Sequence, residues 1–216
     1  MVEAGECFLK KATDSEGGAG VKFVKNGKYD GKPAESFFDE IQDDIVVQCK
    51  IAQSPVLNRL NESSVNTVRV LTLLDRQGVA KAYSSILRMG INGSKVDNAS
   101  AGGITCGINP DGRLNDVAYS AKGEKYLRHP TSGIAFGEIT IPRFGEIQET
   151  ATRLAVSLPH FRLVSWDFAV DADNEIVLIE ANLHYGELDF HQLNNGPIFG
   201  DDQPQILDEV FGLGGK

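Results

Sequence analysis

Near its end the chain carries three oxygen-bearing side chains at spacings that suit a divalent cation. The segment SWDFAV contains Asp167, and the segment VLIEAN contains Glu180 and Asn182. Glu180 and Asn182 are two residues apart, so in a strand both project from the same face. If a two-residue turn of Asp173 and Asn174 joins the two strands, counting outward places Asp167 directly opposite Glu180. Two carboxylates and an amide oxygen then converge on one point.

Repulsion between the two carboxylates is the reason to expect a cation. Like charges directly opposed across strands destabilise a sheet, and here the flanking sequence is apolar. Mg²⁺ prefers oxygen ligands and binds through one or two protein carboxylates, with phosphates and water completing its shell. We therefore predict that Asp167, Glu180 and Asn182 are metal ligands. With a four-residue turn, Glu180 becomes a diagonal neighbour of Asp167, still within reach of one ion. The alternative is a pair of edge carboxylates that face solvent.

A glycine-rich segment near the start could bind the phosphates that accompany such a cation. DSEGGAG, residues 14–20, lies between two predicted strands, and Lys10 is in the strand before it. Backbone N–H groups of such a loop can point at phosphate oxygens, and Lys10 can add a point charge. The sequence contains no GxxxxGK[ST] motif and no GxGxxG between a strand and a helix. The alternative is a glycine-rich turn without a ligand.

Two arginines stand near strand ends close to a second glycine-bearing loop. Arg69 lies in the segment NTVRV, Arg88 ends the next predicted strand, and the loop DNASAGG follows at residues 97–103. Arginines in such places suit anion recognition. Each arginine taken singly is also compatible with a surface ion pair.

Length and charge exclude several other classes of protein. The chain has 216 residues, enough for one large or two small domains, and a net charge of −9. A nucleic-acid-binding protein needs a basic face, so we expect no nucleic-acid partner. No segment approaches the roughly 20 apolar residues of a membrane span. The start, MVEAGECFLKK, lacks the basic and apolar regions of a signal peptide. We expect a cytoplasmic protein without membrane insertion.

The three cysteines are Cys7, Cys49 and Cys106. They are far apart in the sequence and form no CxxC motif, so the sequence predicts neither a disulfide framework nor a zinc site. We expect them to be small buried apolar residues in a reducing compartment.

The elements that position these side chains divide into two lobes. Residues 1–52 are predicted to form strands at 6–11, 21–25 and 44–51 and a helix at 34–42, with an Asn-Gly turn at 26–27. A loop over 52–65 is a candidate hinge. Residues 53–216 are predicted to form three hairpins, 66–75 with 79–89, 103–109 with 113–120, and 162–170 with 175–181, plus a helix ending before Pro159 and a short one at 205–211. The predicted fold class is α+β.

Together these segments resemble the ATP-grasp superfamily, and in particular its sugar-transfer-associated branch, which is related to carboxylate–amine ligases. The resemblance runs from Phe8 to about Gln192. It is carried by the Lys10 strand with DSEGGAG and by the segments SVNTVRVLT, VDNASAGGI and SWDFAV with VLIEAN. It implies an ATP-grasp fold of two lobes with mainly antiparallel sheets. It also implies that the usual N-terminal pre-grasp domain is lacking, which would leave the acceptor site incomplete.

The resemblance implies roles for individual residues. The lysine matching Lys10 contacts the ATP phosphates, and a glycine loop covers them. Near the transferring phosphate or the acceptor the resemblance places Arg88 and Asn98, and Arg69 adds charge there. Many relatives have Glu near Gln48, so base or ribose recognition differs. The implied nucleotide-binding residues are Lys10, Ser15, Glu16, Gly17, Gly18 and Gly20, with Gln48, Cys49, Lys50 and Ile51 lining the adenine pocket; the metal ligands are Asp167, Glu180 and Asn182.

The implied reaction is an ATP- and Mg²⁺-dependent ligation through an acyl phosphate. The substrates would be a small-molecule carboxylate and an amine, or a sugar. Two alternatives stay open: a non-catalytic or partner-dependent nucleotide-binding module, and a sugar phosphotransferase. A partner subunit or a homo-oligomer would be compatible with the lack of the pre-grasp domain. His184 and His191 could lie near the acceptor or could be ordinary surface or core histidines.

Overall fold

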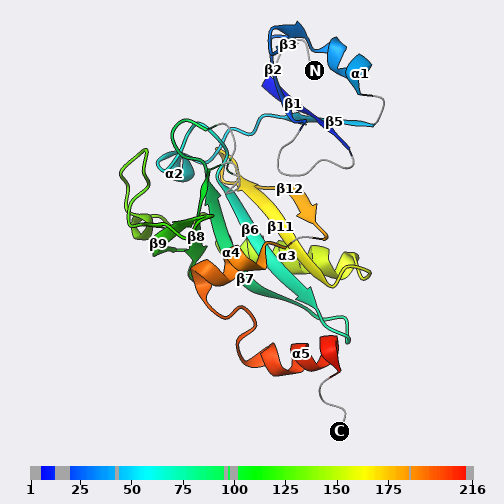
Figure 1. Ribbon diagram of the computed structural model, residues 1–216, viewed down its shortest axis with the longest axis vertical. Helices are drawn as coiled ribbons and strands as arrows, with labels where there is room; N and C mark the ends of the chain where they lie inside the picture. The colour runs from blue at the N-terminus through cyan, green and yellow to red at the C-terminus, as the bar shows by residue number, and fades with distance from the viewer. Residues whose placement is uncertain are drawn as a thin grey trace. The chain divides into compact units, whose positions relative to one another are not determined.

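The computed structural model describes residues 6–12, 20–41, 44–94, 97, 102–184 and 186–212. The chain divides into two compact units, Met1–Ala52 and Gln53–Lys216 (Figure 1).

The smaller unit contains an antiparallel sheet of five strands in the order β4-β3-β2-β1-β5. The strand bounds are β1 (Glu6–Lys11), β2 (Lys22–Lys25), β3 (Lys28–Tyr29), β4 (Lys32–Pro33) and β5 (Ile45–Cys49), and one helix, α1 (Glu35–Glu40), follows β4. Asn26 and Gly27 join β2 to β3 with positive φ angles of 51° and 70°, as the Asn-Gly signal predicts.

The core of the smaller unit lies between one face of this sheet and α1. Cys7, Leu9, Val24 and Phe37 are buried in it, with Tyr29 and Ala34. Phe38, the next residue of the helix after Phe37, is 44% exposed. The reason is geometric: neighbouring helical residues point about 100° apart, and a six-residue helix buries only one narrow side.

The larger unit contains an antiparallel sheet of seven strands in the order β10-β9-β8-β7-β6-β11-β12. The strand bounds are β6 (Thr67–Leu74), β7 (Ala80–Met89), β8 (Ile104–Ile108), β9 (Leu114–Ser120), β10 (Lys125–Tyr126), β11 (Leu163–Val170) and β12 (Ile176–Asn182). The helices are α2 (Pro55–Asn58), η2 (Phe136–Glu138), α3 (Phe144–Ser157), α4 (Leu188–Asn195), η3 (Gly200–Asp202) and α5 (Gln203–Phe211).

Each of the three predicted hairpins forms, and each turn is closed by an aspartate. The carboxylates of Asp75, Asp111 and Asp171 accept hydrogen bonds from backbone N–H groups two residues further on. Such side-chain bonds imitate a backbone turn and explain why Asp favours these positions. Each turn also contains one residue in the left-handed region, namely Gly78, Gly112 or Asn174.

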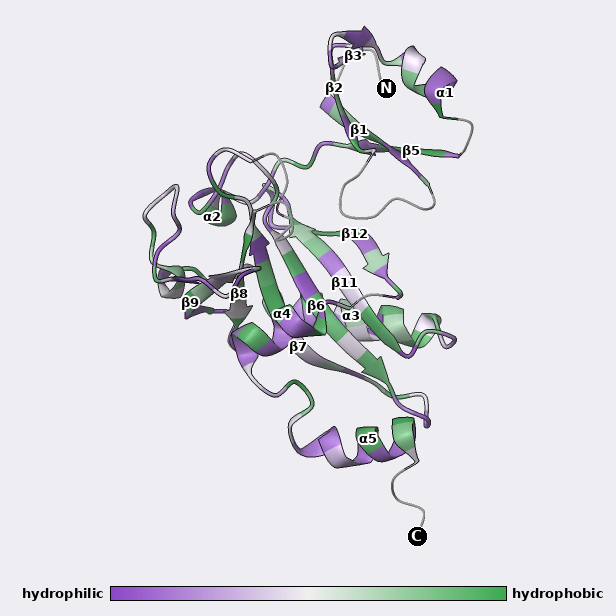
Figure 2. Ribbon diagram, in the orientation of Figure 1, coloured by the Kyte–Doolittle hydropathy of each residue, from purple (hydrophilic) through white to green (hydrophobic). Residues whose placement is uncertain are grey.

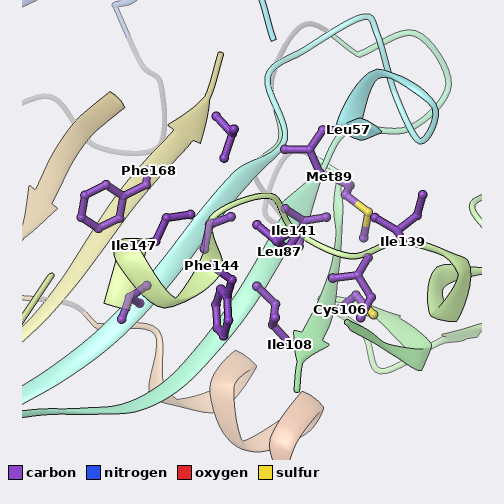
Figure 3. Close-up of a cluster of buried hydrophobic side chains, with 14 of the residues drawn as sticks. Leu57, Leu87, Met89, Cys106, Ile108, Ile139, Ile141, Phe144, Ile147 and Phe168 are labelled. Atoms are coloured by element: carbon purple, nitrogen blue, oxygen red, sulfur yellow. The ribbon is translucent and has the colours of Figure 1, made fainter. Parts of the chain in front are cut away.

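One face of the larger sheet is apolar and packs against α3. The helix buries Phe144, Ile147, Ala151 and Ala155, which recur every three or four residues and therefore form one stripe. They join a single cluster of buried side chains from every central strand (Figure 3). The central strands change between hydrophobic and hydrophilic residues along their length (Figure 2), because successive side chains point to opposite faces. The opposite face carries charged and polar side chains among apolar ones, and is called the polar face.

Three expectations are corrected by the structure. The loop predicted over 52–65 contains the short helix α2. Helix α4 was not predicted, because the residues it buries, His191 and Asn194, are polar and give no apolar periodicity. Cys49 was expected to be buried but is exposed, whereas Cys7 and Cys106 are buried. No helix among the described residues is long and apolar enough to cross a membrane.

Candidate functional site

The strand register gathers the predicted charged residues on the polar face of the larger sheet. Arg69 on β6 lies directly opposite Asp167 on β11, and Asp167 lies directly opposite Glu180 on β12. Residues directly opposite each other share a face, so these three form one row across three strands. In the next row, Arg88 on β7 lies opposite Thr67 on β6.

The opposition of Asp167 and Glu180 agrees with the sequence count, although the assumed turn is wrong. The loop between β11 and β12 has three residues, 172–174, instead of two, and Asn174 adopts a left-handed φ of 61°. That change alone would displace the pairing by one residue. However, the register shifts next to Asp167 and leaves Ile179 as an extra residue in β12. This β-bulge restores the expected pairing.

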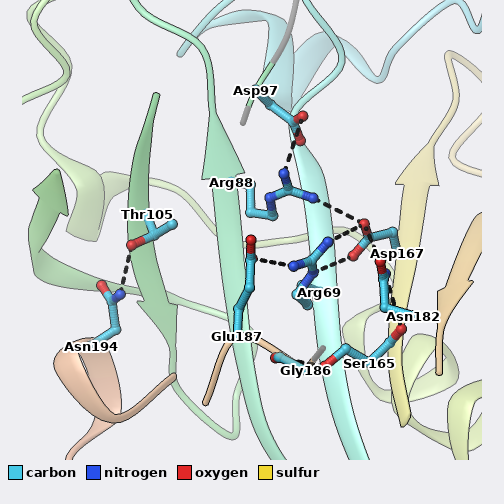
Figure 4. A network of polar contacts seen from close by, with 10 residues as sticks. All are labelled: Arg69, Arg88, Asp97, Thr105, Ser165, Asp167, Asn182, Gly186, Glu187 and Asn194. Atoms are coloured by element: carbon cyan, nitrogen blue, oxygen red, sulfur yellow. Dashed lines mark hydrogen bonds and ion pairs between the residues drawn. The ribbon is translucent and has the colours of Figure 1, made fainter. Parts of the chain in front are cut away.

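Asp167 is a buried carboxylate held by two arginines (Figure 4). Arg69 donates from Nε to Oδ1 at 2.7 Å and from Nη2 to Oδ2 at 2.6 Å. Arg88 donates from Nη1 to Oδ2 at 3.0 Å. Asp167 is 1% exposed, Arg69 3% and Arg88 5%. Bidentate Arg–carboxylate pairs of this kind are strong and geometrically specific.

Two further carboxylates complete the charge network. Glu187 accepts a hydrogen bond from Nη1 of Arg69, and Asp97 lies 3.9 Å from Nη2 of Arg88. Glu187 immediately precedes α4 and has a left-handed φ of 50°, a conformation that costs about 1 kcal/mol or more for a residue other than glycine. The strained backbone therefore holds a carboxylate against Arg69.

Burial and charge act in opposite directions on the carboxylates of the network. Burial opposes ionisation of Asp167, but the hydrogen bonds and charge of Arg69, together with Arg88, outweigh it and hold the pKa of Asp167 below its usual value. At Asp97, burial prevails over the attraction of Arg88 and raises the pKa. Neighbouring carboxylates whose pKa values are pushed apart occur often at functional sites.

The two residues predicted to bind metal with Asp167 lie beside it. Asn182 donates from Nδ2 to the Ser165 carbonyl at 3.2 Å and to Oδ2 of Asp167 at 3.5 Å. Glu180 is exposed, and a hydrogen bond from it also lowers the pKa of Asp167. Two carboxylates within hydrogen-bond reach need a proton or a cation between them. The donor set therefore fits a hard cation, provided that Asp167 exchanges some of its arginine contacts.

Within the described residues, no group of three or more His, Cys, Asp and Glu could hold a metal ion. The predicted set does not contradict this finding, because its third ligand is the amide of Asn182. The metal ligands stay a prediction.

Helix α4 adds a buried histidine that the sequence did not single out from ordinary core histidines. His191 is fully buried, and its Nδ1 lies 2.9 Å from Oγ of Ser84. Ser84 already accepts a hydrogen bond from Nδ2 of Asn195, so its own proton can go to Nδ1. The neutral ring then carries its proton on Nε2, which has no hydrogen-bond partner among the described residues. Burial lowers the pKa of His191 to about 3, and the nearby charges of Arg69 and Asp167 also act on it.

In the smaller unit, Lys10 and Gln48 share a face of the sheet with Phe8. Phe8 lies directly opposite Gln48, and Lys10 is two residues further along β1. Cys49, predicted to line the same pocket, projects to the other face. Lys50 and Ile51 follow the end of β5, and Gly20 has a φ of 79°. Five predicted site residues lie outside the described residues: Ser15, Glu16, Gly17, Gly18 and Asn98.

A model of one protein family matches nearly the whole chain. The sugar-transfer associated ATP-grasp family is matched over residues 1–202. The chain belongs to this family. The resemblance and the α+β fold predicted from the sequence are thus confirmed. No curated protein sequence matches this ATP-grasp chain.

Solved structures share the ATP-grasp fold at low sequence identity. Biotin carboxylase from Campylobacter jejuni, in a β,γ-ATP complex, is 17% identical with a TM-score of 0.53, over 94% of this chain and 36% of that one. The ATP-grasp ligase PsnB, complexed with a phosphomimetic variant of its minimal precursor, Mg and ADP, is 13% identical with a TM-score of 0.52, over 97% and 47%. The chain thus spans about a third to a half of the length of these proteins.

Proposed function

We propose that this chain binds ATP with Mg²⁺ and uses it to join a carboxylate to an amine or a similar nucleophile. The observation that carries the proposal is the buried cluster of Arg69, Arg88 and Asp167, with Glu180 and Asn182 beside it on the same face of the sheet. Membership of the ATP-grasp family supports it. So does the solved structure of PsnB, which has this fold and is a complex with Mg and ADP.

Asp167, Glu180 and Asn182 would hold the magnesium ion. All three offer hard oxygen donors, which Mg²⁺ prefers. When bound, the ion would offset the negative charge of the nucleotide phosphates. A bound magnesium ion would offer Asp167 a positive partner, and a bound phosphate would offer the two arginines a negative one. Asp167 can therefore turn to the cation while the guanidinium groups turn to phosphate oxygens.

Arg69 and Arg88 would bind the phosphoryl group that is transferred. Their planar donor forks match phosphate as well as carboxylate, and both are already held in place by Glu187 and Asp97. Prepositioned positive charge stabilises charge that develops in the transition state without reorganisation at that moment. In the smaller unit, Lys10, the glycine loop over 14–20 and the strand ending at Cys49 would bind the phosphates and the adenine.

The reaction needs positioning but no nucleophile from the protein. A carboxylate oxygen of the substrate bonds to the γ-phosphorus while the bond to the β,γ-bridging oxygen breaks and ADP leaves. The amine then attacks the carbonyl carbon of the acyl phosphate and phosphate leaves. Holding both reactants in line supplies most of the acceleration. The buried thiol of Cys106 is unsuited to attack, since burial raises its pKa to about 12.

His191 would contribute a neutral hydrogen-bond donor to the acceptor substrate. Its Nε2 is buried without a partner among the described residues, an arrangement that costs free energy unless a ligand satisfies it. With a pKa of about 3, the ring stays neutral at physiological pH and donates without adding charge. A carboxylate or phosphoryl oxygen would accept this bond.

Calorimetric titration of ATP, with and without Mg²⁺, tests the proposal. The wild-type chain is compared with the double variant Asp167→Asn/Glu180→Gln. A second double variant, Glu62→Gln/Asp173→Asn, changes net charge equally at two exposed positions. We expect Mg²⁺-dependent binding that only the first double variant loses. Absence of binding in folded wild-type protein, or equal loss in both variants, would contradict the proposed site.

Measurement of ADP release then identifies the reaction class. Release that requires a carboxylate together with an amine supports the ligase. Release that requires a sugar hydroxyl would replace it with a phosphotransferase. Tight MgATP binding without release under any of these conditions would favour a nucleotide-binding module that depends on a partner.

A further inference from the structure

Two cysteines of the smaller unit lie directly opposite each other, although they are distant in the sequence. Strands β1 and β5 are antiparallel neighbours, and their register pairs Cys7 with Cys49. Residues directly opposite each other across an antiparallel pair project to the same face, with Cβ atoms about 4.5–5.5 Å apart. The two thiols therefore stand side by side on one face of the sheet.

The pattern of backbone hydrogen bonds identifies the kind of pair that the cysteines form. The Lys50 N–H donates to the Glu6 carbonyl at 3.1 Å. Hydrogen-bonded and non-hydrogen-bonded pairs alternate along an antiparallel ladder. Since Lys50 and Glu6 form a hydrogen-bonded pair, the next pair, Cys7 and Cys49, is non-hydrogen-bonded. Such pairs bring Cα atoms to about 4.5 Å, which lies within the disulfide range of about 4.4–6.8 Å.

The two thiols differ in accessibility in the way that a two-step oxidation requires. Cys49 is exposed and lies at the end of β5, which is an edge strand of its sheet. Cys7 is 4% exposed and packs in the core with Leu9 and Val24. A small oxidant can reach Cys49, whereas Cys7 is shielded from solvent yet adjacent to Cys49.

We propose that Cys7 and Cys49 are a redox modification site, forming a reversible disulfide with a small-molecule disulfide such as oxidised glutathione. The Cys49 thiolate attacks one sulfur of the oxidant, whose S–S bond breaks and releases one thiolate. The Cys7 thiolate then attacks Cys49 Sγ in the mixed disulfide and releases the second thiolate. Two cysteine thiols are oxidised, one disulfide is reduced to two thiols, and two protons pass from the cysteines to the leaving thiolates.

Cys106 supplies an internal control. It is fully buried in the core of the larger unit, and its Sγ contacts the Asn115 carbonyl oxygen at 3.3 Å. A buried thiol of this kind reacts slowly with oxidants. Replacing it should leave the chemistry of the other two cysteines unchanged.

The test is a redox titration of the full chain in glutathione buffers of varied ratio, followed by alkylation and mass spectrometry. We expect the wild type and Cys106→Ser to lose about 2 Da and two alkylatable thiols at one common midpoint. Trypsin separates the three cysteines into different peptides, because Lys10 and Lys95 lie between them. The cross-linked peptide should therefore join Cys7 to Cys49.

Single variants decide the assignment. Cys7→Ser should stop at the mixed disulfide on Cys49, with a gain of about 305 Da, and Cys49→Ser should not be oxidised under the same conditions. Cys7→Ala replaces Cys7→Ser if the serine variant is not folded by circular dichroism. A mass loss that persists in a folded Cys49 variant would overturn the proposal. Folded wild-type protein that yields only the mixed disulfide, or only dimers, would do the same.

Discussion

The two faces of the larger sheet are built from alternate residues of the same strands, yet different interactions stabilise them. Trp166 and Phe168 point into the apolar core against α3, while Asp167 between them points into the charge cluster. Burial of apolar surface is non-directional and tolerates conservative changes in shape. A buried ion pair gains little over apolar packing, but removal of one partner is costly. Stability is thus expected mainly from one face, and the proposed binding of MgATP from the other.

The largest expected effect comes from breaking the polar face. Arg69→Met keeps side-chain volume but leaves Asp167 and Glu187 without their main partner. We expect the free energy of unfolding to fall by about 3–5 kcal/mol, together with loss of MgATP binding. Urea denaturation and calorimetry measure the two effects. Arg113→Met, at an exposed position, should change stability by less than about 0.5 kcal/mol. Equal stability of the two variants would show that the cluster is not energetically coupled.

Breaking the apolar face should separate stability from binding. Leu87 is fully buried in the core that packs on α3. Leu87→Ala should lower the free energy of unfolding by about 3 kcal/mol, whereas the dissociation constant for MgATP, measured where the variant is folded, should change less than about twofold. Leu87→Met, which conserves volume, should cost less than about 1.5 kcal/mol. A large loss of affinity in Leu87→Ala would mean that the two faces are not independent.

Acidification should weaken the polar face first. The pKa of His191 is about 3 in the folded chain and about 6.5 when unfolded, so between these values the unfolded state binds more protons. Stability is therefore full above pH 6.5 and falls as the pH drops, by about 2 kcal/mol between pH 6.5 and pH 5. His191→Gln should reduce this slope in urea titrations. Burial also lowers the pKa of His129, which adds a slope of the same sign in both proteins.

The smallest expected effect is on the KM for the acceptor substrate, and it distinguishes the two ring nitrogens of His191. Asn can imitate Nδ1 and keep the contact with Ser84, whereas Gln reaches the position of Nε2. If Nε2 donates to the acceptor substrate, His191→Asn should raise the KM for the acceptor about tenfold, a loss of roughly 1.4 kcal/mol, with kcat little changed. His191→Gln should stay near the wild type. A KM raised equally in both variants would indicate a purely structural histidine.

Local signals account for what the sequence predicted well. Turn residues such as Asp75 and Asp111 form hydrogen bonds with backbone groups only a few positions away. The hairpins and most strand bounds can therefore be predicted from the sequence. The spacing of Glu180 and Asn182 is likewise local, and their shared face follows from it. Family resemblance added the nucleotide-binding residues, such as Lys10 and Gln48, which stay a prediction.

The missed features depend on contacts between distant segments. The partnership of Arg69 with Asp167 needs the order of strands in the sheet, in which β6 lies beside β11. The pairing of Cys7 with Cys49 needs the register of β1 against β5. Helix α4 turns His191 and Asn194 towards the sheet, so a search for apolar stripes passes over it. Sequence spacing carries none of this information.

The bulge at Ile179 determines which residues of β12 share a face with Asp167. Its extra residue places Glu180, and not Ile179, directly opposite Asp167. If the pairing continued regularly beyond Leu178, Glu180 and Asn182 would project to the apolar face, because a one-residue slip reverses the alternation of a strand. The loop has no such influence, since Asp171 and Glu175 pair at its base, where the Asp171 N–H donates to the Glu175 carbonyl at 3.0 Å. Loops of other lengths can therefore be grafted at 172–174 as long as this pair is kept, whereas the phase of β12 depends on the bulge.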